Sequence, residues 1–382
     1  MSIKKKIYYG IDIALVIAQA VVSVILAVSL IRMNILEMWI VCLTIAVLVI
    51  LLAVCIVPLF LKKKKLIAWR VINIIISIVC IAGGIFALRY TGSLNSLFDK
   101  IADDKEVAQT EIDVTKDPFI IYISGSDSHT SVDDPDARSD VNILAVVNPV
   151  KSKILFVSIP RDTYVQLHGT TGYRDKLTHA GLNNNTELSK QTLEDFLEIK
   201  IDYVVKVSFD TVVEMVDALD GIDIYSDKNM YLHAESKTDP NKFCTYIVGT
   251  QHVDGDCALR FARERKSYST GDKHRGENQQ VVLTAILNKC LSSKSYLLRL
   301  PEILSIVADS FKTTLSRDDI TKFMRNQLTN NINWQMESIG LDGVGDLLPT
   351  YTYGDSQMLW VMLPDEESLA NIKSRIAENL EK

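Results

Sequence analysis

Residues 141–159 read VNILAVVNPVKSKILFVSI, and this stretch decides the predicted fold class. Two near-continuous apolar runs, at residues 141–147 and 153–159, flank a turn at Asn148 and Pro149. Apolar runs of this length without polar alternation are typical of strands whose sheet is covered on both faces. The stretch therefore predicts two strands of a buried sheet.

Strand and helix patterns continue on both sides of this stretch. Residues 119–124 (FIIYIS) and 203–209 (YVVKVSF) predict further strands, and helices are expected at residues 189–200 and 211–219. Strands that alternate with helices predict a three-layer α/β/α domain. A last helix is expected near residues 366–380.

The amino-terminal part contains three long apolar runs, at about residues 7–31, 35–61 and 66–88. Each run is long enough to cross a bilayer as a helix, and a cleaved signal peptide fits poorly because two more runs follow the first. Lysines occupy residues 4–6 and 62–65. By the positive-inside rule, the N-terminus is cytoplasmic and everything after the third helix is extracellular. The sequence thus predicts a multi-pass protein of the cell membrane.

These patterns divide the chain into four parts. Residues 1–90 contain the three transmembrane helices, and residues 91–117 form an extracellular tether. Residues 118–295 form the α/β/α core. Residues 296–382 are expected to be a helical and mixed extension packed on the core.

Residues 261–280 read FARERKSYSTGDKHRGENQQ and lead into an apolar helix. Asp272 is expected to cap this helix, which places Arg275 and Gln279 one turn apart on the same face. The helix N-terminus favours an anion. Arg263 and Arg265 arrive from the preceding segment, and guanidinium groups suit phosphate oxygens. The stretch predicts an anion site, although a solvated charge run is the alternative.

Nucleic acid is not the expected partner of these arginines. The net charge of the chain is −6, and the cluster is too local to track a polynucleotide backbone.

Polar residues stand at the ends of three predicted strands. Asp127 follows the first, Arg138 and Asp140 precede the second, and Arg161 and Asp162 follow the third. Ligands in α/β sheets gather beside strand ends. The two carboxylates of residues 127 and 140 could share one Mg²⁺ or Mn²⁺, although each alone suits a turn or strand cap. Together with the arginines, the set predicts a metal-assisted pyrophosphate site.

Cys244 and Cys257 flank a short segment that bears a turn. In an exported domain they could form a disulfide. Two separate buried thiols are an equal alternative.

Several motifs, in this order, resemble the signatures of the LytR–CpsA–Psr (LCP) family. The resemblance runs from about residue 119 to about residue 290, and residues 291–382 carry no signature. The motifs are GSDS at 125–128, ARSD at 137–140, SIPRD at 158–162, DKLTHAG at 175–181, IDYVVKVSF at 201–209, VDALDGIDI at 216–224, DGDCALRFARER at 254–265 and GDKHRGENQQ at 271–280.

The resemblance implies a membrane-anchored phosphotransferase of the Gram-positive cell envelope. Such enzymes take an anionic glycopolymer, such as a teichoic acid or capsule polysaccharide, from a polyprenyl-pyrophosphate carrier. They attach it to peptidoglycan through a phosphodiester bond. The apolar helices and the sheet are then expected to enclose the polyprenyl tail.

Roles carry over by motif. Asp127 and Asp140 are expected to hold Mg²⁺, and Asp162 is expected to orient Arg161 or to assist proton removal. The residues expected to bind the pyrophosphate are Arg138, Arg161, Arg263, Arg265, Arg275 and Gln279. The expected catalytic residues are Arg161, Asp162, Arg263, Arg265 and Arg275.

Two other functions fit the same residues. With water as the acceptor, the site would be a polyprenyl-glycan pyrophosphatase, and the acceptor leaves no motif that separates the two. A non-catalytic receptor for lipid-linked precursors is the third reading. The paired Asp127 and Asp140 argue against it, because an anion receptor gains nothing from them without a metal.

Overall fold

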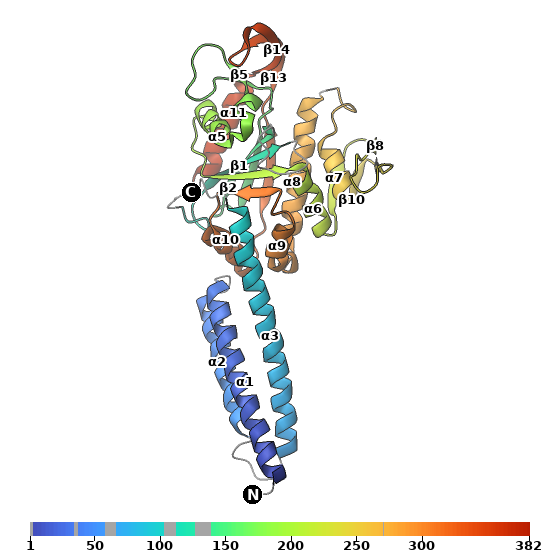
Figure 1. The fold of residues 1–382 in the computed structure, drawn as a ribbon. Helices are drawn as coiled ribbons and strands as arrows, with labels where there is room; N and C mark the ends of the chain where they lie inside the picture. Colours follow the sequence, from blue (N-terminus) through green and yellow to red (C-terminus); the bar gives the residue numbers. More distant parts are fainter. Residues whose placement is uncertain (1–2, 34–36, 58–65, 103–111, 127–138, 270) are drawn as a thin grey trace. The chain divides into compact units, whose positions relative to one another are not determined.

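The structure is a computed structural model that describes the whole chain except residues 1–2, 34–36, 58–65, 103–111, 127–138 and 270 (Figure 1). The chain divides into two compact units, Met1–Ser96 and Leu97–Lys382. Two predicted site residues, Asp127 and Arg138, lie outside the described residues.

The first unit consists of long apolar helices. Within them, Ile13–Arg32, Met38–Ile56 and Val71–Gly92 are long and apolar enough to cross a membrane, as predicted. The third helix is longer than expected, because it continues through the first part of the predicted tether. The helices are α1 (Ile3–Met33), α2 (Met38–Ile56) and α3 (Leu66–Ile101).

The second unit is built on a six-stranded sheet in the order β11-β6-β1-β2-β3-β12. Neighbours β1, β2 and β3 are antiparallel, whereas β6 runs parallel to β1 and β12 runs parallel to β3. All the strands predicted between residues 119 and 209 are present. The strands are β1 (Phe119–Ser126), β2 (Ser139–Asn148), β3 (Lys153–Ser158), β6 (Tyr203–Ser208), β11 (Phe311–Thr313) and β12 (Gln335–Gly340).

Helices cover one face of this sheet through a continuous apolar core. Leu144 and Val157 of the sheet share this core with Leu193 and Ile372, and all four are buried. The elements on this side are α4 (Leu177–Ala180), a 3-10 turn (Leu182–Asn184), α5 (Thr186–Leu197) and α11 (Glu366–Leu380).

The other face packs against a second set of helices. Ile143 and Phe156 belong to a core that also takes in Leu283, Leu287 and Phe323. Alternate residues of one strand thus face two apolar layers, which explains the unbroken apolar runs and confirms the three-layer α/β/α prediction. The helices here are α6 (Phe209–Ala218), α7 (Gly255–Ala262), α8 (Asp272–Ser292), α9 (Lys294–Ile306) and α10 (Arg317–Asn330).

Short strands extend from this body. They form the pairs β4 (Tyr164–Val165) with β5 (Asp175–Lys176), β7 (Ile222–Ser226) with β10 (Gly249–Val253), β8 (Met230–His233) with β9 (Phe243–Tyr246), and β13 (Gly343–Thr350) with β14 (Gly354–Pro364).

The carboxy-terminal segment is part of the body rather than an extension packed on it. β11 and β12 are the two edge strands of the main sheet, and α11 belongs to one helix layer. Asn148 fixes α11 to the sheet, because its Nδ2 donates to the carbonyl oxygens of Asn379 and Glu381 at 2.8 Å each. Residues 296–382 therefore complete the sheet and its covering.

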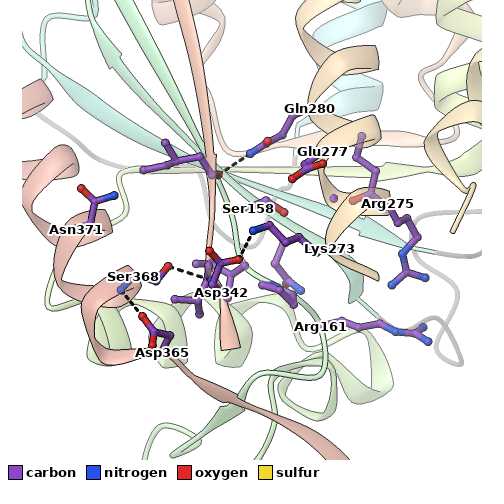
Figure 2. Close-up of a pocket in the computed structure, with 18 of the residues that line it drawn as sticks. Ser158, Arg161, Lys273, Arg275, Glu277, Gln280, Asp342, Asp365, Ser368 and Asn371 are labelled. Atoms are coloured by element: carbon purple, nitrogen blue, oxygen red, sulfur yellow. Dashed lines mark hydrogen bonds and ion pairs between the residues drawn. The ribbon is translucent and has the colours of Figure 1, made fainter. Parts of the chain in front are cut away.

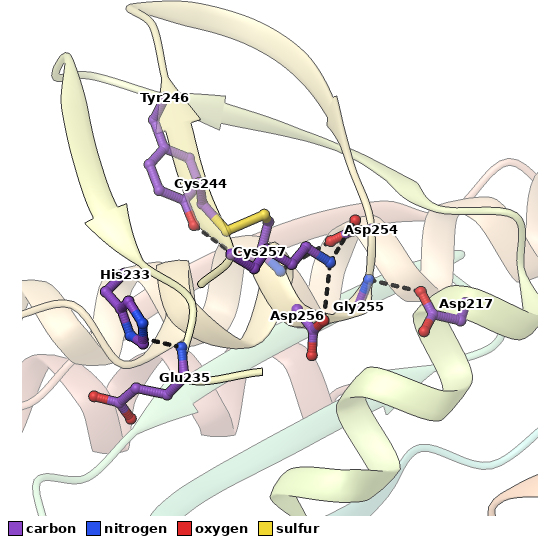
Figure 3. Close-up of a disulfide and its surroundings, with 10 residues drawn as sticks. Asp217, His233, Glu235, Cys244, Tyr246, Asp254, Gly255, Asp256 and Cys257 are labelled. Carbon is purple, nitrogen blue, oxygen red and sulfur yellow. Dashed lines mark hydrogen bonds and ion pairs between the residues drawn. A yellow bond between two sulfur atoms is a disulfide. The ribbon is translucent and has the colours of Figure 1, made fainter. Parts of the chain in front are cut away.

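A disulfide joins Cys244 of β9 to Cys257 of α7, with 5.5 Å between the two Cα atoms (Figure 3). Asp254 caps α7 by accepting a hydrogen bond from the Cys257 N–H at 3.1 Å. Of the two alternatives left open by the sequence, the disulfide is the one present. It ties the β8–β9 hairpin to the helix that leads into the arginine motif.

Replacing Cys244 with serine is expected to lower the free energy of unfolding by about 3 kcal/mol, because the bond closes a loop of 13 residues. For a unit of this size the melting temperature should fall by roughly 6–12 °C. Thermal unfolding of wild type and variant, each with and without a reductant, checks this. A reductant should lower the melting temperature of wild type alone, and an unchanged wild type would contradict the prediction.

Candidate active site

A polar cavity of about 500 Å³ lies where β2 begins and β3 and β12 end, beside the start of α8 (Figure 2). Four predicted site residues line it, namely Asp140, Arg161, Arg275 and Gln279. Arg275 and Gln279 are one turn apart on α8 and share its cavity face, as the spacing predicts. In Figure 2 the guanidinium groups of Arg161 and Arg275 extend to the same side of the cavity.

The start of α8 differs from the prediction. Asp272 is the first residue of the helix rather than its cap, and the preceding Gly271 has a φ of 35°, which favours glycine. The N–H of Arg275 donates to the Gly271 carbonyl at 3.1 Å. One turn on, a Cβ at Gly276 would lie 3.1 Å from Ser158 Oγ, so glycine lets the helix approach the end of β3. The helix N-terminus thereby reaches the cavity.

Two acidic residues hold the cations beside the strand ends. Arg161 Nη1 lies 2.7 Å from Asp140 Oδ2. Asp162 Oδ1 lies 2.7 Å from Lys176 Nζ, whereas its Oδ2 is 3.7 Å from Arg161 Nε. The nearer partner of Asp162 is therefore Lys176. The sequence offered Lys176 only as a member of the DKLTHAG motif, without a role.

Asn142 is a cavity residue that sequence reasoning missed. Its Oδ1 accepts hydrogen bonds from Tyr122 Oη at 2.6 Å and from Ser139 Oγ at 2.9 Å. Burial raises the pKa of Tyr122, so the phenol stays protonated and its O–H donates the hydrogen bond. Within the described part of the chain, the buried Nδ2 of Asn142 has no hydrogen-bond partner. The sequence spacing could have indicated that Asn142 lines the cavity, because residues two apart, such as Asp140 and Asn142, lie on the same face of a strand.

An apolar cavity of about 380 Å³ lies between the sheet and the helix layer that contains α8. Its walls include Ile143 and Phe156 of the sheet and Ile286 of α8. Gln279 lines both this cavity and the polar one, so the two cavities adjoin at this side chain. A polar compartment thus lies next to an apolar one.

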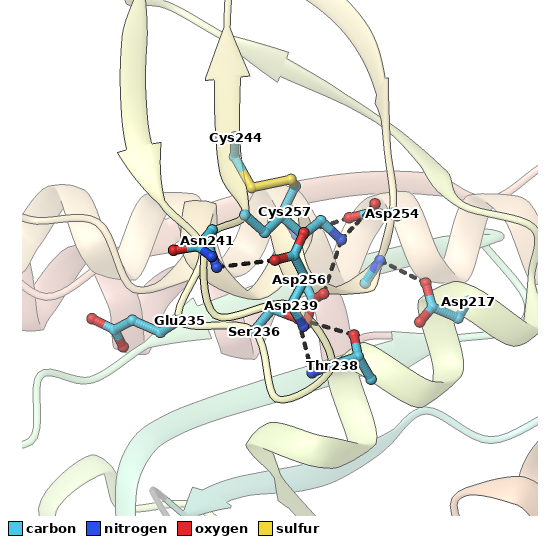
Figure 4. A network of polar contacts seen from close by, with 12 residues as sticks. Asp217, Glu235, Ser236, Thr238, Asp239, Asn241, Cys244, Asp254, Asp256 and Cys257 are labelled. Atoms are coloured by element: carbon cyan, nitrogen blue, oxygen red, sulfur yellow. Dashed lines mark hydrogen bonds and ion pairs between the residues drawn. A yellow bond between two sulfur atoms is a disulfide. The ribbon is translucent and has the colours of Figure 1, made fainter.

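Arg263 lines the apolar cavity rather than the polar one. Its guanidinium lies 4.6 Å from the centroid of the Phe209 ring, and Nη1 is 2.9 Å from Glu235 Oε2. Glu235 precedes a loop held by internal hydrogen bonds, in which Ser236 Oγ accepts from the Thr238 N–H at 3.2 Å (Figure 4). The hairpin held by the disulfide therefore presents the partner of Arg263.

Arg265 is exposed and is not among the residues that line either cavity. The reason lies in its neighbour Glu264, which is 1% exposed, pairs with Arg260 and accepts the Ser267 N–H at 2.7 Å. Burial raises the pKa of Glu264, but the Ser267 N–H and the Arg260 guanidinium outweigh it and lower the pKa overall. Because Glu264 turns inward, Arg265 turns outward. The structure does not bring Arg265 to the other predicted residues.

Asp175 fixes the segment that carries Lys176. It is fully buried, with Oδ1 2.6 Å from His179 Nδ1 and Oδ2 accepting from Thr352 Oγ1 at 2.6 Å. Burial raises the pKa of Asp175, but the hydrogen bonds from His179 and Thr352 outweigh it, and the net shift is downward. Asp175 therefore joins the DKLTHAG segment to the turn between β13 and β14.

Replacing Asp175 with asparagine is expected to lower the melting temperature at pH 7 more than at pH 3. A carboxyl whose folded pKa is depressed stabilises the fold above its unfolded pKa of about 3.9. This stabilisation is lost as the pH falls through the folded pKa. Thermal unfolding of both proteins at the two pH values checks this. Equal differences at pH 7 and pH 3 would contradict it.

This chain is similar to known proteins over most of its length. The LytR_cpsA_psr family model matches residues 85–375. The polyisoprenyl-teichoic acid–peptidoglycan teichoic acid transferase TagU of Bacillus mycoides is 30% identical over 287 residues, covering 73% of this chain and 89% of that protein. The TagU of Enterococcus faecalis is 31% identical over 264 residues, covering 68% and 82%.

Solved structures show the same fold. The structure of TagT bound to LIIa-WTA is similar with a TM-score of 0.57 and 26% identity, covering 73% of this chain and 98% of that one. The crystal structure of Bacillus subtilis TagV has a TM-score of 0.55 and 26% identity, covering 69% and 98%. Since the family model takes in most of the second unit and the relatives align over more than two thirds of the sequence, this chain belongs to the LytR_cpsA_psr family.

Proposed function

We propose that this protein transfers an anionic glycopolymer from a polyprenyl-pyrophosphate carrier to peptidoglycan through a phosphodiester bond. The observation that supports this proposal most directly is that a polar cavity lined by Arg161 and Arg275 adjoins an apolar cavity at Gln279. A polyprenyl pyrophosphate has the same division into a charged head and an apolar tail. The names of the TagU relatives, which describe teichoic acid transfer, support the same reaction.

The polar cavity would bind the pyrophosphate head. Arg161 and Arg275, together with the N-terminus of α8, neutralise the charge that builds on the leaving polyprenyl phosphate. The acceptor hydroxyl oxygen bonds to the phosphorus next to the glycan, and the P–O bond to the polyprenyl phosphate breaks. The leaving phosphate takes the electron pair and the hydroxyl proton. The protein contributes position and charge rather than covalent chemistry.

Asp162 would act as a positioning residue. Its carboxylate is held by Lys176 at 2.7 Å and lies 3.7 Å from Arg161 Nε. A carboxylate that binds two cations holds both of them in place. Asp162 therefore orients Arg161 and Lys176 toward the phosphates.

The apolar cavity would hold the polyprenyl tail. Each buried CH₂ group contributes about 0.8 kcal/mol, so the tail supplies binding energy remote from the reacting phosphorus. Arg263 and Gln279 line this cavity and would contact the phosphate nearest to the lipid.

Mg²⁺ or Mn²⁺ fits the polar cavity. Asp140 lies on its wall and offers carboxylate oxygens, the ligand type that Mg²⁺ prefers alongside substrate phosphates. The described residues contain no group of three or more His, Cys, Asp or Glu that could hold a metal, and one or two carboxylates suffice for Mg²⁺. When bound, the ion stabilises negative charge on phosphate oxygens. Asp127, the second expected ligand, lies outside the described residues.

We infer that the second unit works outside the cell, with the N-terminus of the chain in the cytoplasm. The lysines at residues 4–6 and 62–65 support this orientation. The disulfide between Cys244 and Cys257 supports it independently, because disulfides persist in oxidising surroundings.

The test uses the full chain in detergent with a polyprenyl-pyrophosphate glycan, Mg²⁺ and uncrosslinked peptidoglycan. Mass spectrometry follows polyprenyl phosphate and glycan-bearing peptidoglycan, with Asp140→Ala and Arg275→Ala as controls. An adduct that needs Mg²⁺ and is lost in both variants is the expected result. Release without an adduct would replace transfer by hydrolysis. Lipid binding without turnover would make the protein a receptor.

A further inference from the structure

The polar cavity has a second wall opposite the two arginines. It is formed by residues 339–342, at the end of β12 and just after it, and by the first turns of α11. In Figure 2 Asp342, Ser368 and Asn371 lie on one side of the cavity, whereas the guanidinium groups of Arg161 and Arg275 lie on the other. We call this the α11 wall. It belongs to the part of the chain that carries no sequence motif.

The cavity is larger than its arginine side requires. A pyrophosphate group occupies roughly 200 Å³ if each oxygen-sized group takes about 30 Å³. Of the cavity's 500 Å³ this leaves roughly 300 Å³, enough for a further ligand of about one sugar residue.

The α11 wall has a different charge from the arginine side. Its lining residues include Asp342, Asp365 and Glu367 but no lysine or arginine. Lys273 of α8, which also lines the cavity, is paired with Asp342 at 2.6 Å. An anionic glycopolymer is therefore disfavoured at this wall. Carboxylate and amide oxygens accept hydrogen bonds from hydroxyl groups, which suits a neutral sugar.

The α11 wall is held rigid by its own hydrogen bonds. The N–H of Asp342 donates to Ser368 Oγ at 3.0 Å, and the N–H of Asp365 donates to the Asp342 carbonyl at 2.9 Å. Asp365 caps α11 by accepting the Ser368 N–H at 2.8 Å, so a carboxylate of the protein already occupies this helix N-terminus. Asn371, one turn further along, is exposed and lines the cavity. Its amide can both donate to and accept from a ligand.

We propose that the α11 wall is the acceptor subsite and binds a neutral glycan that carries hydroxyl and N-acetyl groups. Asn371 contacts the acetamido group, and Asp342 accepts hydrogen bonds from hydroxyls. The opposed walls then place an acceptor hydroxyl against a phosphorus bound by Arg161 and Arg275. This inference rests on the proposed function for its reaction, but binding of the glycan can be measured without turnover.

The test compares full-length wild type with Asn371→Ala, with Ser374→Ala as the matched control. Ser374 is exposed on the same helix and is not among the cavity residues. The first measurement is binding of a neutral disaccharide of N-acetylglucosamine by calorimetry. Asn371→Ala should weaken binding about tenfold, which is the effect of losing one or two hydrogen bonds. Ser374→Ala should bind as wild type does.

The second measurement is transfer at varied acceptor concentration. Asn371→Ala should raise the acceptor KM about tenfold and change the donor KM much less, whereas Ser374→Ala should leave both KM values as in wild type. Equal acceptor affinity and KM in Asn371→Ala and wild type would overturn the subsite. Binding that depends on Asn371 in a protein that transfers nothing would keep the subsite and overturn the proposed function.

Discussion

Replacing Arg275 with alanine is expected to lower turnover about 10²-fold or more, by comparison with the loss of one oxyanion donor in other enzymes. Arg275 lines the polar cavity from the first turn of α8, where its charge adds to that of the helix N-terminus. Both act on charge that is greatest in the transition state, so the loss falls mainly on kcat. Steady-state release of polyprenyl phosphate measures it.

Arg265→Ala is the matched control for this variant. It removes the same charge from the same motif region, but Arg265 is exposed and outside both cavities. Its turnover should stay within twofold of wild type. Equal losses in the two variants would show that proximity in sequence, rather than the polar cavity, marks the residues that contact the pyrophosphate.

Replacing Ala145 with phenylalanine is expected to raise the KM for a long-chain donor on the order of 10²-fold. Ala145 is buried on β2 and lines the apolar cavity, so the added ring takes space that the tail would fill. Displacing three or four CH₂ groups costs about 2.4–3.2 kcal/mol at 0.8 kcal/mol each. Initial rates at varied donor concentration measure the effect.

A donor with a short lipid chain provides the control for Ala145→Phe. Its tail leaves the cavity partly empty, so its KM should change much less than that of the long-chain donor. Equal changes for both donors would show that the tail binds elsewhere. Since overpacking costs about 1–3 kcal/mol, the assay is run below the measured melting temperature of the variant.

The spacing of residues within short segments predicts much of the candidate site. Where a predicted residue lies elsewhere, a neighbouring residue explains the difference. Arg275 and Gln279 share the cavity face of α8 because residues four apart lie one turn apart. Arg265 was predicted in the cluster because its segment leads into α8, but the neighbouring Glu264 is buried and Arg265 is exposed. Arg260 and Glu264 are four residues apart, a spacing that favours their ion pair, but the spacing does not show that Glu264 is buried in the folded protein.

The contacts that sequence reasoning missed mainly join residues on different segments of the chain. Lys176 meets Asp162 because β5 pairs with β4, and Asn142 is fixed by Tyr122 from the neighbouring strand. Asp127 and Arg138 stay predictions, since they lie outside the described residues.

By itself, the sequence determined three helices long and apolar enough to span a membrane, the buried strands at residues 119–124, 141–147 and 153–159, and the family. These properties depend on apolar run length, on periodicity within a few residues and on motif order, all of which are local. Only the tertiary structure decided that β12 pairs with β3, and that the cavity takes one wall from α8 and another from α11. Gln335 of β12 pairs with Lys153 of β3, about 180 positions away, and the two walls of the cavity are about 90 positions apart. Both arrangements are selected by the packing of whole layers rather than by any pattern within one segment.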